Sequence, residues 1–153
     1  MFFFLKSLYL YCVALWVGSM FFFTVIGAPA AFKIFKKEEA GKYTGFIFPK
    51  YFVLGNLFGL LALVSFYILV KESMTIVAWL NLLFLLVMNM SNFINGFFIT
   101  PRANSLKMEY YRTRDESYYN SFLKLHGVSM ALNGLNLLLG FMIIGITSLY
   151  LTF

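Results

Sequence analysis

Residues 74–99 read MTIVAWLNLLFLLVMNMSNFINGFFI, an apolar run without a charged side chain. A helix of roughly 20 apolar residues is enough to cross the ~30 Å hydrocarbon layer of a bilayer. Three further apolar runs cover about residues 5–32, 51–70 and 122–152. We therefore predict an all-α fold, an integral membrane four-helix bundle, in which residues 1–153 form a single transmembrane domain with one helix in each run.

Composition also indicates a membrane protein. Of the 153 residues, 61% are hydrophobic and only 12% are charged, whereas soluble domains carry about 25% charged residues. The net charge is +6, but the charges gather in two loops, so we expect a lipid bilayer as the partner and no nucleic acid. A single cysteine excludes an internal disulfide framework.

The basic residues are distributed unevenly between the two sides of the predicted bundle. Residues 33–50 and 102–124 would lie on the same side, and they hold 10 of the 12 Lys and Arg residues. Because cytoplasmic loops of membrane proteins are enriched in Lys and Arg, we predict that both loops are cytoplasmic and both termini are on the non-cytoplasmic side. The short loops favour a bacterial inner (cytoplasmic) membrane.

A polar stripe runs along the last apolar segment and begins at His126, the only histidine of the chain. At 100° per residue, the polar residues of this stripe fall on one face of a helix. Lipid offers them no hydrogen-bond partner, so the stripe must face protein or a water-filled cavity. A matching row of amides on residues 74–99 predicts a polar cavity between the third and fourth helices. The predicted lining residues are His126, Ser129, Asn133, Asn136, Asn92, Asn95 and Arg102, with Arg102 at the cytoplasmic rim.

The same residues allow other interpretations. The amides could pair across helices as structural contacts, each contributing on the order of 0.6–2 kcal/mol. His126 and Met130 are one helical turn apart and are candidate metal ligands, since imidazole and thioether suit Cu(I) or a haem axial position. However, methionine is also an ordinary filler of apolar cores, and one histidine cannot ligate a haem from both sides. The cofactor is therefore left open, with haem or copper as the candidates.

Hydrolytic catalysis is not expected, and an enzymatic function is otherwise left open. The sequence has no nucleophile–base pair and no phosphate-binding glycine loop, and all six acidic residues fall outside the apolar segments. Three functions stay open: handling of a small solute or metal species through the polar cavity, a haem- or copper-binding membrane redox protein, and a non-catalytic membrane accessory subunit. Transport by so small a bundle is expected to need a homo-oligomer.

Prolines and glycines predict two features of the helices. Pro29 and Pro101 lie near the charged ends of the first and third helices, and each lacks a backbone N–H, so each should kink or end its helix. Gly55 and Gly59 form a small-xxx-small pair, which lets a neighbouring helix approach closely. No internal sequence repeat is visible.

Several short motifs together resemble the transmembrane protein 205-like family (domain of unknown function 4149), with a more distant similarity to copper-resistance-D-type membrane proteins. The resemblance implies a four-helix membrane protein and, because eukaryotic members are linked with tolerance of toxic metal drugs, a loose connection to transport and metal tolerance. The motifs are Leu15-Trp16-Val17-Gly18, Ala28-Pro29 and Phe32 in the first part, Ile99-Thr100-Pro101-Arg102 in the middle, and Phe122, His126, Ser129 and Asn133 near the end.

Overall fold

The chain is all helical in the computed structural model, which describes residues 2–150. This confirms the all-α part of the predicted fold class for the described residues. In chain order the elements are α1 (Phe2–Phe22), the π-helical η1 (Phe23–Gly27), α2 (Ala28–Ile34), α3 (Lys37–Val70), α4 (Ile76–Ile94), the π-helical η2 (Asn95–Ile99), α5 (Thr100–Thr113) and α6 (Glu116–Tyr150).

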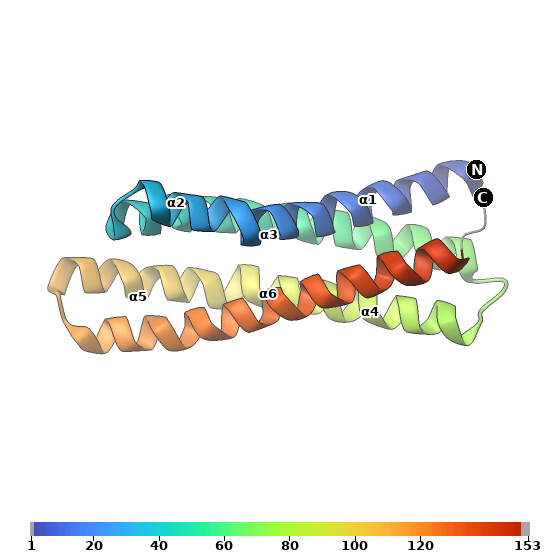
Figure 1. Ribbon diagram of the computed structural model, residues 1–153. Coiled ribbons are helices and arrows are strands. Elements are labelled where there is room, and N and C mark those ends of the chain that lie inside the picture. The colour runs from blue at the N-terminus through green and yellow to red at the C-terminus, as the bar shows by residue number, and fades with distance from the viewer. Residues whose placement is uncertain (1, 151–153) are drawn as a thin grey trace.

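These elements join into four long rods that lie side by side and alternate in direction (Figure 1). The first rod is α1–η1–α2, the second is α3, the third is α4–η2–α5, and the fourth is α6. Each rod is long and apolar enough to cross a membrane. The predicted fourth helix extended to residue 152, and its last two positions lie outside the described residues.

The rods are longer than the apolar runs. The 34 residues of α3 correspond to about 51 Å at 1.5 Å per residue, compared with ~30 Å of hydrocarbon. The start of α1, the end of α6 and the α3–α4 turn lie at one end of the bundle, on the right in Figure 1. The opposite end consists of α2, the first part of α3, α5 and the first part of α6, and we call it the charged end.

Local signals explain why the charged end is helical. At the start of α3, the backbone N–H of Lys36 donates to Glu39 Oε2 at 3.4 Å, and Glu38 and Glu39 lie in the first turn, where a helix favours negative charge. At the other connection, α5 ends because Arg114 adopts the left-handed conformation, with φ 59°. Residues that hydropathy assigns to loops are therefore mostly helical turns.

The bundle buries a core of apolar and polar side chains, and it exposes aliphatic and aromatic side chains around its circumference. Trp16, Phe52 and Leu85 are fully enclosed. Leu60, on α3, and Leu138, on α6, are by contrast 57% and 66% exposed. Apolar side chains that point away from the core suit contact with lipid tails, which supports contact with a bilayer.

Two glycines on α3 allow α1 to pack closely against it. A Cβ on Gly55 would lie 2.8 Å from Trp16 Nε1, and a Cβ on Gly59 would lie 2.7 Å from the Trp16 ring. Both distances are too short for any side chain. The predicted small-xxx-small contact is therefore present, and its partner is an indole ring.

The two prolines do not end their helices. In each half of the chain a π-helical segment is followed by one residue and then by proline, at Pro29 and at Pro101. Proline has no N–H to donate and its ring crowds the carbonyl of the preceding turn, and the wider π turn gives that carbonyl room. The two halves also share the same element order, α–π–α followed by one long helix.

Candidate functional site

Buried polar side chains lie along the inside of the bundle. We call six of them the polar seam, because each is at most 7% exposed and has at least one polar atom without a hydrogen-bond partner among the described residues. They come from three of the four rods. The polar seam consists of Trp16, Asn81, Ser91, Asn92, Asn95 and Asn136.

The end of the seam nearer the termini is tied together by a short hydrogen-bond chain. Asn81 Nδ2, on α4, donates to the Tyr9 hydroxyl of α1 at 2.9 Å. The Tyr9 hydroxyl also hydrogen-bonds with Thr147 Oγ1 of α6, at 2.7 Å. Three rods therefore meet at one buried tyrosine.

In the middle of the seam, Asn92 and Asn95 each use the amide nitrogen but not the amide oxygen, and Asn136 uses neither. Asn92 Nδ2 donates to the Phe52 carbonyl at 2.9 Å, and Asn95 Nδ2 donates to the Ser129 carbonyl at 3.0 Å. The Oδ1 atoms of both asparagines make no hydrogen bond within residues 2–150. Asn136 is 0% exposed and neither atom of its amide has a partner there.

Asn133 lies nearer the charged end and joins three rods. Its Oδ1 accepts from the Tyr51 hydroxyl at 2.8 Å, and its Nδ2 donates to Thr24 Oγ1 of η1 at 3.1 Å. Sequence reasoning did not identify Tyr51 or Thr24 as partners, because hydropathy does not show which helices face one another.

The remaining predicted site residues occupy different surroundings. His126 is half-buried and its ring stacks on Phe122, with ring centroids 5.3 Å apart. Arg102 is exposed, and Met130 is 61% exposed. The structure therefore brings Asn95 to Ser129 and buries Asn92 and Asn136 in the seam, while the shared cavity lined by all seven residues stays a prediction.

The structure does not support the metal interpretation. No group of three or more His, Cys, Asp or Glu side chains within the described chain could hold a metal ion. Neither haem nor copper gains support from this geometry.

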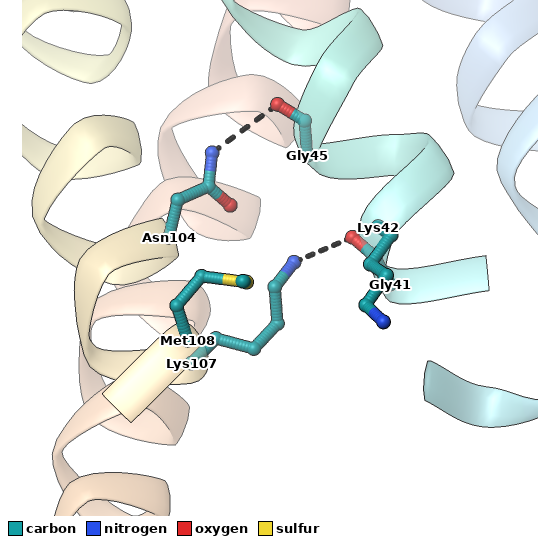
Figure 2. Close-up of a pocket in the computed structure, with 6 residues that line it drawn as sticks. All are labelled: Gly41, Lys42, Gly45, Asn104, Lys107 and Met108. Atoms are coloured by element: carbon teal, nitrogen blue, oxygen red, sulfur yellow. Dashed lines mark hydrogen bonds between the residues drawn. The ribbon is translucent and has the colours of Figure 1, made fainter. Parts of the chain in front are cut away.

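A hollow of about 180 Å³ lies at the charged end, between α3 and α5. Figure 2 shows Lys107 reaching from α5 to the backbone of α3, where its Nζ donates to the Gly41 carbonyl at 2.7 Å. Asn104 Nδ2 donates to the Gly45 carbonyl at 3.3 Å. The sequence placed Lys107 in a charged loop, where a lysine is expected to be solvated. The only sequence signal for its contact with α3 was the pair Gly41 and Gly45, four residues apart.

A second hollow, of about 200 Å³, is lined by the apolar side chains of Leu63, Trp79 and three neighbouring leucines. Two of these side chains, Trp79 and Leu83, are more than half exposed. This hollow therefore lies on the lipid-facing side and carries no polar chemistry.

The fold and its buried polar side chains define an all-helical membrane protein. Residues 11–112 match the family described as a domain of unknown function, DUF4149. The chain belongs to this family. It is 31% identical over 128 residues to an uncharacterized protein of Aquifex aeolicus (strain VF5), and the match covers 84% of this chain and 85% of the relative. No solved structure matches the chain.

The comparisons bear on only part of the resemblance drawn from the sequence. They support the domain of unknown function, whereas the links to transmembrane protein 205 and to copper-resistance-D-type proteins stay resemblances. The motif from Phe122 to Asn133 lies beyond the matched residues 11–112.

Proposed function

We propose that this protein is a small integral membrane protein that conducts a small uncharged solute through the polar seam. The observation that carries the proposal is the set of buried polar atoms without partners, above all the complete amide of Asn136. A polar group left unpaired in an apolar medium costs roughly 1–3 kcal/mol or more. A solute or water molecule hydrogen-bonded to these atoms would remove that cost.

The chemistry of the seam favours an uncharged solute. Its side chains are amides, a hydroxyl and an indole, which offer donors and acceptors without net charge. No Asp, Glu, Lys or Arg belongs to the seam, so an ion would have no counter-charge there. This selects molecules of the size and polarity of water, urea or glycerol ahead of the metal species.

The π-helical segments lie beside the seam and give it a means of adjustment. Thr24 of η1 hydrogen-bonds with Asn133, and Asn95 of η2 hydrogen-bonds with the Ser129 carbonyl. Both contacts fall on adjacent turns of α6. Single-turn π segments frequently accompany functional sites, and a shift of either one would change the seam.

The distribution of Lys and Arg residues supports one orientation of the bundle in the membrane. We infer that the charged end faces the cytoplasm of a bacterial inner membrane, with both termini on the other side. Conduction is expected to need a homo-oligomer, because four helices leave little room for a path. Size-exclusion chromatography with light scattering on the detergent-solubilised protein would measure the oligomeric state.

The test uses purified protein reconstituted into liposomes, with stopped-flow light scattering as the readout for water, urea and glycerol. Wild-type protein should raise the permeability to at least one of them above that of empty liposomes. Asn136→Leu should return it to that of empty liposomes. Ser148→Ala is the matched control on the same helix, because Ser148 is exposed and its hydroxyl donates to the Gly145 carbonyl.

The same variant also separates solute handling from a structural role. Because Leu removes an unpaired buried amide, Asn136→Leu should unfold at the same temperature as the wild type or higher. Loss of permeability with retained stability supports the proposal. Wild-type permeability equal to that of empty liposomes for all three probes would overturn it and favour an accessory subunit.

A further inference from the structure

Lys107 carries a buried positive charge at the charged end. Its side chain lies between α3 and α5 and the residue is only 8% exposed. None of the ion pairs in the described part of the chain includes Lys107. Its Nζ has the Gly41 carbonyl at 2.7 Å and the Phe122 ring at 5.7 Å. Burying an ammonium group without a counter-ion is costly, so this arrangement calls for an anion.

The surroundings of Lys107 leave room for one. The hollow of about 180 Å³ next to it is lined by Gly41, Lys42, Gly45, Asn104, Lys107 and Met108 (Figure 2). A Cβ on Gly45 would lie 3.1 Å from Asn104 Oδ1 and 3.4 Å from Lys107 Nζ. An ammonium group has three donors, and Gly41 uses one. The two glycines therefore let side chains of α5 come close to the backbone of α3, and the hollow lies beside a cation that has donors to spare.

The neighbouring charges add to the positive potential. Lys42 also lines the hollow, and its Nζ lies 3.2 Å from Glu38 Oε1. The other oxygen of that carboxylate lies 3.8 Å from Arg114 Nη2. One negative charge is thus shared by two cations, while Lys107 has none, so the hollow has an excess of positive charge.

We propose that this hollow binds a phosphate group, supplied either by an anionic lipid headgroup or by free phosphate. A phosphate presents acceptor oxygens on several sides, which suits donors on two different helices. Lys107 lies eight residues beyond Ile99, about 12 Å along the helix at 1.5 Å per residue. This position is at or just beyond the headgroup layer. The site does not depend on the polar seam or on conduction.

The test measures the thermal unfolding temperature of purified protein in a neutral detergent. Sodium phosphate is compared with sodium chloride at equal ionic strength, and vesicles containing phosphatidylglycerol are compared with vesicles of phosphatidylcholine alone. Phosphate or phosphatidylglycerol should raise the unfolding temperature of the wild type by several degrees. Lys107→Met should lose this shift, and Lys33→Met, which changes an exposed lysine at the same end, should keep it.

A second variant guards against misfolding of Lys107→Met. Gly45→Ala keeps the charge but places a methyl group in the hollow, so it should reduce the shift. A shift with sodium phosphate identifies free phosphate as the ligand, and a shift with phosphatidylglycerol alone identifies a lipid headgroup. The proposal is overturned if neither probe stabilises the wild type, or if Lys107→Met or Gly45→Ala responds as the wild type does.

Discussion

Asn92, Asn95 and Asn136 show how far hydropathy and periodicity reach at the scale of a residue. Their position on polar faces of apolar helices predicted that they would be buried, and each is 0% exposed. The pattern could not show that their oxygens lack donors, because that depends on which N–H or O–H groups of the neighbouring helices lie opposite. The burial of Lys107 could not be predicted either, because a lysine in a charged stretch of sequence is expected to be solvated.

Asp115 provides a pH-dependent prediction. Its Oδ1 accepts from the backbone N–H of Ser117 at 2.8 Å, at the start of α6, and this hydrogen bond lowers the pKa of the Asp115 carboxyl below its ordinary value of 3.8. The folded pKa is thus below the unfolded one. The contribution to stability is present above the unfolded pKa and is lost as the pH falls through the folded pKa.

We therefore expect Asp115→Ala to lower the unfolding temperature at neutral pH and to lower it less in strong acid, where only the charge-assisted part of the hydrogen bond is lost. Asp115→Asn is the control, because an amide can still accept this hydrogen bond but does not titrate. Thermal melts of the wild type, Asp115→Ala and Asp115→Asn between neutral pH and strong acid measure the effect. Equal destabilisation by Asp115→Ala at both extremes would contradict it.

At the scale of an element, α3 depends on its glycine face. A Cβ on Gly59 would meet the rigid ring of Trp16 at 2.7 Å, whereas nothing lies within 4 Å of a Cβ on Gly134 of α6. We expect Gly59→Ala to cost about 1–3 kcal/mol, as overpacking does, and Gly134→Ala to be neutral or stabilising by about 0.5–1 kcal/mol. Reversible unfolding in mixed micelles would measure both, and a destabilisation of similar size for the two variants would count against this packing.

The lengths of the elements could be predicted only in part. Four apolar runs correctly indicated four long helices, because burial in lipid requires unbroken apolar sequence. The turns of α3 and α5 beyond those runs carry lysines and arginines, and hydropathy cannot distinguish a charged helix in water from a loop. Pro29 and Pro101 were expected to kink or end their helices, and the π turns beside them explain why the rods continue.

At the scale of the whole molecule, the charge distribution predicts orientation. Ser105 is exposed at the charged end and Ser73 is exposed in the α3–α4 turn at the opposite end, while the native Cys12 is 4% exposed. In a Cys12→Ser background, a membrane-impermeant maleimide applied to intact cells should label Ser73→Cys. It should label Ser105→Cys only after lysis, and the reverse pattern would show the opposite orientation.

The matching order of elements in the two halves has a consequence for how the molecule is organised. Each half starts at the same end of the bundle, runs α–π–α to the charged end and returns as one long helix. Each half is a helical hairpin of two rods, and the α3–α4 turn connects the two hairpins in the way that a linker joins the subunits of a fused dimer. The two π segments carry their hydrogen-bonding side chains at different positions, because Thr24 is the second residue of η1 and Asn95 is the first residue of η2.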